Sequence, residues 1–231
     1  MVSEGFEKDW HSTQNAAYLD LLESRLNEPR LHWVDQFVAI INRELANGVL
    51  KGRSLISIND YGCNVGHFFR GVNDINCAVS YHGFDISATY LSVAKRRFGE
   101  EHFQHLDIEQ CPENVIWPQS DVAIISATLE HVENYSSALR SIFLRTRDLV
   151  VLRTFVGEVT LMDKCRTAGA NSDYLIRQFT IDDLAKIPRE LGWRYSQEID
   201  RATSGKTKMV CNGKSVPRAQ TVMVFTKFES G

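Results

Sequence analysis

The sequence predicts an α/β fold in which helices cover both faces of a mostly parallel β-sheet. From residue 54 onward, short apolar runs alternate with stretches of helical periodicity, a pattern typical of parallel sheets. The first apolar run also leads straight into a glycine-rich turn at residues 62–66, and a helical pattern follows that turn. We therefore expect ligands to bind at the edge of the sheet where the parallel strands end.

The first part of the chain is predicted to be a helical extension. Residues 12–47 contain two helical patterns separated by Pro29, and Gly48 ends the second. We divide the chain into an N-terminal extension over 1–50 and an α/β domain over 51–231. The extension is expected either to form a lid that excludes water from a pocket or simply to pack against the domain.

The elements of the α/β domain follow from the same patterns. Helices are expected after Gly66, over 87–98 and near 180–191. The last two strands are expected to be antiparallel to each other. The strands are predicted at 54–60, 78–85, 102–107, 121–126, 149–154, 193–199 and 220–228.

Composition and charge exclude several classes of function. The chain has 26 Lys and Arg against 29 Asp and Glu, a formal net charge of −3, so its overall field does not attract nucleic acid. The longest apolar runs, such as 122–125 and 149–152, are far shorter than the ~20 residues that a membrane span needs. The start of the chain is acidic, unlike a secretory signal. We expect a cytoplasmic protein without a nucleic-acid or membrane partner.

The five cysteines and seven histidines do not predict a metal site. No two cysteines form a CxxC pair, and no histidines show convincing ligand spacing. An odd number of cysteines also fits poorly with a disulfide framework. Reduced thiols and no metal are therefore expected.

The turn after the first strand is the first candidate binding element. Gly62, Asn64 and Gly66 are residues that tolerate left-handed backbone, so a ligand can approach the main chain closely. The dinucleotide pattern G-x-G-x-x-G is absent, because the position of its last glycine holds His67. A nicotinamide enzyme is thus disfavoured. Taken alone, the turn could also serve only to connect a strand to a helix.

Two carboxylates follow the next two strands. Asp85 ends the second strand and Asp107 the third, so both lie at the predicted binding edge. A carboxylate at the end of the second strand can accept hydrogen bonds from both ribose hydroxyls of a nucleoside. The alternative is that each acid caps the helix that follows, although Ser87 is a better cap than Asp85.

On these residues the sequence resembles the class I S-adenosylmethionine-dependent methyltransferases. The segment DYGCNVG at 60–66 looks like the first motif of that family, and GFDIS at 83–87 is similar to the second. LDI at 106–108 resembles the third, and SATLEHV at 126–132 resembles the segment after the fourth strand. The likeness is close over 54–155, and beyond it only the order of elements agrees.

The resemblance implies a Rossmann-like three-layer sandwich with a seven-stranded, mostly parallel sheet whose last strand is antiparallel. It implies S-adenosylmethionine as the cofactor. Asn64 departs from the family, which most often has glycine at that position. The cofactor-binding residues that it implies are Asp60, Gly62, Cys63, Asn64, Gly66, Asp85, Ile86, Asp107, Ile108 and Ser126.

The same resemblance implies a role for each part of this set. The turn 62–66 would pass under the methionine part of the cofactor, with Asp60 near its amino group. Asp85 would bind the ribose, Asp107 would accept a hydrogen bond from the adenine amine, and the two isoleucines would pack on the base.

Three residues are candidates for catalysis. An oxygen or nitrogen that receives a methyl group must lose a proton, and His131 is the first candidate base because its ordinary pKa is ~6.5. Since Glu-His recurs at this place in the family across different acceptors, packing or cofactor contact is the alternative. Glu130 would serve as base instead, or orient the loop. Arg153 would either hold an anionic acceptor or pair with Glu130 or Glu158.

The sequence thus predicts transfer of a methyl group to an oxygen or nitrogen of a small polar acceptor. A basic stretch at 201–218 either receives a phosphate or carboxylate on that acceptor or is a solvated loop. Two other classes stay open. One is a non-catalytic S-adenosylmethionine-binding module that acts through protein partners, and the other is a nucleotide-dependent oxidoreductase.

Overall fold

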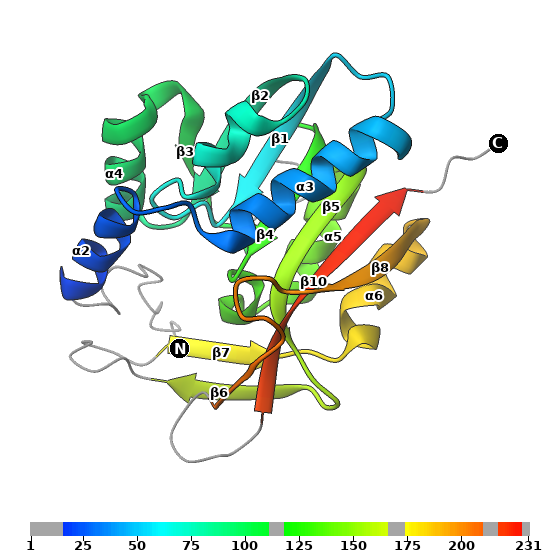
Figure 1. The fold of residues 1–231 in the computed structure, drawn as a ribbon. Helices are drawn as coiled ribbons and strands as arrows, with labels where there is room; N and C mark the ends of the chain where they lie inside the picture. The colour runs from blue at the N-terminus through cyan, green and yellow to red at the C-terminus, as the bar shows by residue number, and fades with distance from the viewer. Residues whose placement is uncertain (1–15, 111–117, 166–173, 210–216, 228–231) are drawn as a thin grey trace.

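The computed structural model describes residues 16–110, 118–165, 174–209 and 217–227 (Figure 1). Its helices are α2 (Ala16–Arg25), α3 (His32–Asn47), η1 (Phe68–Asp74), α4 (Ala88–Phe98), η2 (Glu100–His102), η3 (Leu129–His131), α5 (Tyr135–Arg145) and α6 (Ile181–Glu190). Its strands are β1 (Leu55–Tyr61), β2 (Ala78–Asp85), β3 (Phe103–His105), β4 (Ser120–Ser126), β5 (Thr146–Val156), β6 (Leu161–Cys165), β7 (Tyr174–Gln178), β8 (Trp193–Ile199), β9 (Thr207–Met209) and β10 (Pro217–Lys227).

The main sheet has the topology that the sequence predicts. Its order is β3-β2-β1-β4-β5-β10-β8, and the short strand β9 pairs with β10. Strands β1 to β5 are parallel, whereas β10 runs antiparallel to both β5 and β8. The crossover between β3 and β4 brings β1 to the middle of the sheet. The turn that follows β1 therefore lies at the centre of the predicted binding edge.

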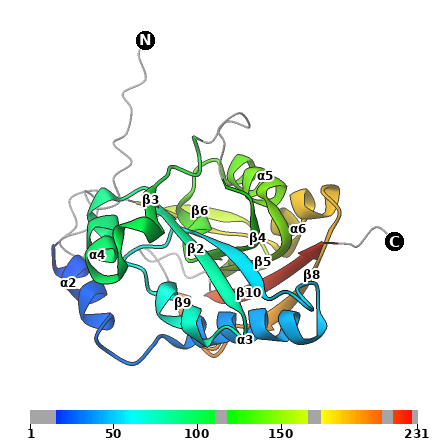
Figure 2. The same ribbon diagram turned by 90° about the horizontal axis from the view of Figure 1, so that it is seen from above.

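Helices cover both faces of the sheet, which confirms the three-layer architecture (Figure 2). One core cluster joins α3, η1 and α4 to one face through residues such as Phe37, Phe68 and Leu91. The other joins α5 and α6 to the opposite face through Leu139 and Leu184. Because central strands are buried on both sides, their residues form continuous apolar runs. This is why those runs were readable in the sequence.

The N-terminal helices pack against the domain at two places. Helix α3 lies along the sheet, where Trp33 contacts Phe37 and Phe68 with ring centroids 5.3 and 6.4 Å apart. Helix α2 packs its Leu22 and Leu26 in a separate cluster beside α4. Gly48 ends α3 as predicted. The lid role of this extension stays a prediction.

Two elements differ from the sequence-based expectation. The helix after Gly66 is the 3₁₀ helix η1, seven residues long. A Cβ atom on its Gly71 would lie 2.8 Å from the side chains of Val34 and Val38, so α3 packs closely over it. In addition, β6 and β7 form an antiparallel hairpin outside the main sheet, which the sequence patterns did not predict.

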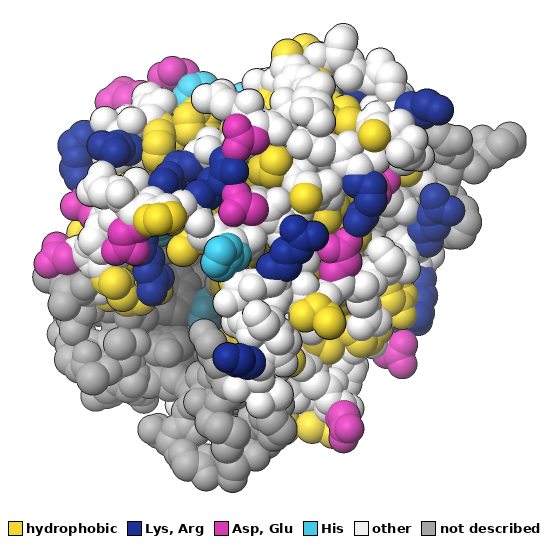
Figure 3. Space-filling view, viewed as in Figure 1, with side chains coloured by type: hydrophobic (Ala, Val, Ile, Leu, Met, Phe, Trp, Pro, Cys, Tyr) yellow, Lys and Arg dark blue, Asp and Glu magenta, His cyan; other side chains and the backbone are white. Residues whose placement is uncertain are grey.

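The surface agrees with the small net charge. On the face shown in Figure 3, basic and acidic side chains are interspersed among the described residues. In the described part of the chain, no helix is both long enough and apolar enough to cross a membrane.

Candidate active site

The turn after β1 adopts left-handed backbone at three alternate residues. The φ angles of Gly62, Asn64 and Gly66 are 76°, 55° and 86°. A Cβ atom on Gly62 would lie 2.1 Å from Thr128 Oγ1, so a glycine is needed there. Asn64 replaces a glycine without loss of the turn, because its Oδ1 accepts a hydrogen bond from the Val65 N–H at 2.7 Å. The predicted turn is therefore present and locked by its own side chain.

Asp85 lies directly beside this turn, at the end of β2. Its Oδ2 accepts from the Asn64 N–H at 2.8 Å, and its Oδ1 accepts from the Ser87 N–H at 2.9 Å. Ser87, rather than Asp85, caps α4 through its Oγ. Each Asp85 oxygen retains a second lone pair for a ligand. Burial raises the pKa of Asp85 to about 6, against the hydrogen bonds from Ser87 and Asn64.

Asp60 lies behind the turn rather than on its open side. Its side chain is 3% exposed and accepts a hydrogen bond from the Tyr81 hydroxyl at 2.8 Å. Burial raises its pKa to about 7, although the Tyr81 hydrogen bond acts in the opposite direction. Burial also raises the pKa of the Cys63 thiol. The predicted contact of Asp60 with the cofactor's amino group stays a prediction.

The residues after β3 form a partly apolar wall next to Asp85. Ile108 is buried in the core cluster that contains Phe84. Ile86 is half-buried, directly after Asp85. Asp107 accepts a hydrogen bond from the Glu109 N–H at 2.9 Å, so it organises its own turn. The structure thus brings the predicted ribose and adenine residues to neighbouring strand ends.

The segment after β4 places the two acid–base candidates in different surroundings. Ser126 ends β4, and Thr128 packs on Gly62. Glu130 is 1% exposed and accepts a hydrogen bond from Thr154 Oγ1 at 2.8 Å. This contact favours the loop-orienting role for Glu130. His131, by contrast, is only half-buried.

The tautomer of His131 follows from one contact. Its Nδ1 lies 2.7 Å from the carbonyl oxygen of Leu175, in the hairpin strand β7. A carbonyl only accepts, so Nδ1 carries the hydrogen and Nε2 of the neutral ring is the basic nitrogen. Burial lowers the pKa of His131, although Glu130 and the Leu175 carbonyl oppose this effect. The ring is therefore neutral near pH 7 with Nε2 unprotonated.

Arg153 pairs with a residue that the sequence patterns did not indicate. Its Nε and Nη2 donate to the two carboxylate oxygens of Asp200 at 2.8 and 3.2 Å. The expected pairing with Glu130 or Glu158 is therefore wrong. Asp200 also accepts from the Thr203 N–H and hydroxyl. With its charge already neutralised in a buried pair, Arg153 is better suited to hold the chain after β8 in place than to bind an anionic acceptor.

The basic stretch 201–218 is only partly described. Arg201 and Lys206 are exposed, in agreement with a solvated loop. Residues 210–216, which include Lys214, lie outside the described part, as do the side chains of Lys208 and Arg218.

Several residues of the site carry no sequence signal. Asp60 contacts Tyr81, which lies 21 residues away in the sequence. His131 contacts Leu175 across 44 residues, and Arg153 contacts Asp200 across 47. Such partners follow from strand order rather than from spacing, so only the folded sheet reveals them. Among the described residues, no group of three or more His, Cys, Asp or Glu side chains is arranged to hold a metal ion.

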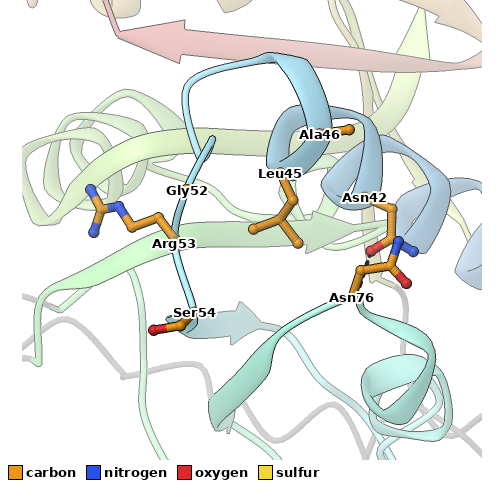
Figure 4. Close-up of a pocket in the computed structure, with 7 residues that line it drawn as sticks. All are labelled: Asn42, Leu45, Ala46, Gly52, Arg53, Ser54 and Asn76. Atoms are coloured by element: carbon orange, nitrogen blue, oxygen red, sulfur yellow. Dashed lines mark hydrogen bonds between the residues drawn. The ribbon is translucent and has the colours of Figure 1, made fainter.

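A surface hollow of about 320 Å³ lies at the other edge of the sheet, where β1 and β2 begin (Figure 4). Asn42, Arg53 and Asn76 line it. The Asn42 side chain accepts from the Asn76 N–H at 2.8 Å and donates to the Asp74 carbonyl, and Arg53 pairs with Asp121. Its polar groups are thus already paired with one another or with the fold.

Residues 60–148 match the family described as "Methyltransferase domain". This part of the chain is therefore similar to a methyltransferase domain. The match begins at Asp60 and extends beyond His131, so it includes the turn, Asp85, Asp107 and the segment after β4. This confirms the resemblance predicted from the sequence. No curated protein sequence matches the chain.

Several solved structures share the fold of this chain. Streptomyces venezuelae DesVI is 12% identical with a TM-score of 0.62, over 93% of this chain and 99% of that one. Magnesium protoporphyrin IX methyltransferase (ChlM) from Synechocystis PCC 6803, with bound SAM, is 18% identical with a TM-score of 0.53, over 93% and 85%. Burkholderia thailandensis 1,6-didemethyltoxoflavin-N1-methyltransferase is 17% identical with a TM-score of 0.53, over 92% and 90%.

Proposed function

We propose that this domain binds S-adenosylmethionine at the ends of β1, β2 and β4 and transfers its methyl group to an oxygen or nitrogen of a small polar acceptor. The observation that carries the proposal is the left-handed turn 62–66 with the Asp85 carboxylate hydrogen-bonded beside it. Solved relatives of this fold, including one with bound SAM, support the choice of cofactor.

The residues at this edge fit an adenosyl ligand. The turn has left-handed backbone at Gly62, Asn64 and Gly66, and its two glycines allow Thr128 and Phe98 to pack closely against it. Asp85 has acceptor capacity left on both oxygens for two ribose hydroxyls. Ile86 and Ile108 supply apolar surface for a base, and Asp107, directly before Ile108, supplies an acceptor for an amine.

The bound cofactor would supply an electrophilic methyl group on a sulfonium. This chain's own contribution is to position the acceptor and to take its proton. His131 Nε2 is the group that we assign to proton removal, because the Nδ1 contact with Leu175 leaves Nε2 as the basic nitrogen. Glu130, fixed by Thr154, keeps the segment that carries His131 in place.

A small acceptor is supported by the relatives and by the surface. Two proteins with the same fold are methyltransferases named after small molecules, magnesium protoporphyrin IX and 1,6-didemethyltoxoflavin. The net charge of −3 gives no general attraction for nucleic acid. A cytoplasmic location is part of this proposal.

Calorimetry with S-adenosylhomocysteine tests the cofactor site. We expect Asp85→Ala to weaken binding by about 1–3 kcal/mol, because two ribose hydroxyls lose their acceptor. Asp182→Ala, which removes an exposed carboxylate on α6, is the matched control and should leave binding unchanged. If the wild-type protein gives no binding heat, the proposal is wrong.

Turnover separates an enzyme from a binding module. We expect S-adenosylhomocysteine to form when the protein is incubated with S-adenosylmethionine and a panel of small hydroxy and amino compounds. His131→Ala should lower the rate about 100-fold with little change in cofactor affinity. Binding without product from any acceptor would instead favour a non-catalytic S-adenosylmethionine-binding module.

A further inference from the structure

Arg177, in the hairpin strand β7, is a buried cation with an unusual set of partners. It is 7% exposed, and no described carboxylate forms an ion pair with it. Its Nη1 donates to the Val132 carbonyl at 2.8 Å, and its Nη2 lies 3.2 Å from the Glu133 carbonyl oxygen. Its guanidinium also stacks over the Tyr135 ring, 4.7 Å from the centroid. All of these partners belong to the segment that directly follows His131.

The same guanidinium holds both strands of the hairpin. Nη2 contacts the Met162 sulfur in β6 at 3.3 Å, and the carbon of the guanidinium lies 5.8 Å from the centre of the Phe179 ring. The Phe179 N–H donates to the Phe155 carbonyl at 3.0 Å, and the Phe179 carbonyl accepts from the N–H of Gly157, directly after β5, at 2.9 Å. Arg177 therefore joins the hairpin, the end of β5 and the segment after η3 at one point.

This geometry has a consequence for His131. The ring contacts Leu175, only two residues before Arg177 on the same strand. If the hairpin and the segment after η3 separate, the Leu175 carbonyl leaves Nδ1, and the contact that favours the Nδ1–H tautomer is lost. A lysine could not replace the guanidinium of Arg177. Two separate nitrogens of the guanidinium contact the carbonyls of Val132 and Glu133, whereas an ammonium carries its charge on a single nitrogen.

We propose that Arg177 is a positioning residue, which clamps the β6–β7 hairpin onto the segment 129–135 and thereby keeps His131 in the tautomer with a basic Nε2. Only the role of His131 as a catalytic base rests on the proposed function. The Arg177 contacts and the His131 tautomer can be observed without an acceptor. A buried arginine needs its donors satisfied, and here the two backbone carbonyls and the aromatic rings satisfy them.

The test compares Arg177→Met with Arg189→Met in the full-length protein. Arg189 is the matched control, because it also lies over a tyrosine ring, 5.2 Å from the centre of Tyr195, but on α6. Imidazole nitrogen NMR, assigned with His131→Gln, reports the tautomer. Hydrogen exchange reports the amides of His131 and Val132, which donate within the same turn.

For Arg177→Met we expect a mixture of His131 tautomers, amide exchange at least about tenfold faster in the turn, and S-adenosylhomocysteine affinity within about twofold of wild type. Arg189→Met should change none of these. A folded Arg177→Met protein with the wild-type tautomer and exchange rates overturns the proposal. If that variant does not fold, Arg177→Lys should show the same changes to a smaller extent, and an unchanged His131 spectrum there also overturns it.

The two proposals fail separately. Absence of S-adenosylhomocysteine binding by the wild-type protein contradicts the proposed function, whereas the His131 spectrum of the Arg177 variants still decides the clamp.

Discussion

Buried carboxylates of this fold differ in how fully the protein pairs them, as Asp121, where β4 begins, shows beside Asp60 and Asp85, where β1 and β2 end. At the edge where strands begin, Asp121 accepts four hydrogen bonds, from the Ser57 N–H and hydroxyl and from Arg53 and Arg147. Burial alone would raise its pKa, but these donors outweigh burial and hold the pKa below its usual value. At the edge where strands end, Asp60 and Asp85 have fewer donors, and burial raises the pKa of each.

The two kinds of buried carboxylate contribute differently to the stability of the fold and to ligand binding. A carboxylate whose lone pairs are all used by the fold stabilises it, whereas one with lone pairs left over costs stability and can receive a ligand. The hollow of Figure 4 lies at the first edge, and its polar groups are already paired. The hollow of Figure 4 is therefore not the place where the chemistry favours ligand binding.

The largest expected effect is at the fully paired edge. Asp121→Ala should lower the free energy of unfolding by about 4 kcal/mol, because it leaves the Ser57 donors without an acceptor and two arginines side by side. Denaturant unfolding measures this loss. Calorimetry on the remaining folded protein should show unchanged S-adenosylhomocysteine affinity, and a large loss of affinity would contradict the division of roles.

A smaller effect, of opposite sign, is expected at Asp60. Its pKa is about 7 in the folded protein, against 3.8 for an unperturbed aspartate. The folded state thus binds the Asp60 proton more tightly than the unfolded state does. The free energy of unfolding therefore falls as the pH rises from about 4 to about 7, and above pH 7 it stays at its lowest value. Asp60→Asn should stabilise the protein by at most about 4 kcal/mol at pH 8, the free-energy equivalent of this pKa difference, and hardly at all at pH 4.

The Asp60→Asn comparison is read from thermal or denaturant unfolding at both pH values. Asn can still accept the Tyr81 hydroxyl hydrogen bond through Oδ1, so the loss of charge is the main change. An equal effect at pH 4 and pH 8 would show that packing, and not ionisation, decides the outcome.

The smallest effect concerns the pH dependence of binding. In the proposed complex, ribose hydroxyls would donate to the charged form of Asp85, whose pKa is about 6 in the protein without ligand. Affinity for S-adenosylhomocysteine should therefore be constant above about pH 7 and fall about tenfold by pH 5. Titrations at several pH values measure this, and Asp85→Asn should bind more weakly with a flatter profile over the same range. A wild-type profile as flat as that of the variant would remove Asp85 from the site.

The sequence predicted the sheet better than the contacts at its edge. Runs such as Val122 to Ile125 are buried on both faces, so the fold itself keeps them apolar and readable. The turn at Gly62 was readable because left-handed backbone restricts residue type. Helix α6 was also predicted, and its Thr180 capping box fixes where it begins.

The missed features depend on contacts between distant residues. The hairpin strand β6 is only five residues long and exposes Met162 and Lys164, so it carries little apolar signal. The partner of Arg153 could not be chosen from the sequence, because Asp200 lies beside Arg153 only through the pairing of β10 with both β5 and β8. Likewise, the close packing of α3 against Gly71 of the 3₁₀ helix η1 is a tertiary contact that the sequence pattern does not show.

The β6–β7 hairpin contributes no strand to the main sheet. Residues can consequently be inserted, deleted or exchanged in it without a shift in the register of any neighbouring strands from β3 to β8. The main sheet can thus keep its strand pairing while the element that contacts His131 through Leu175 varies in sequence.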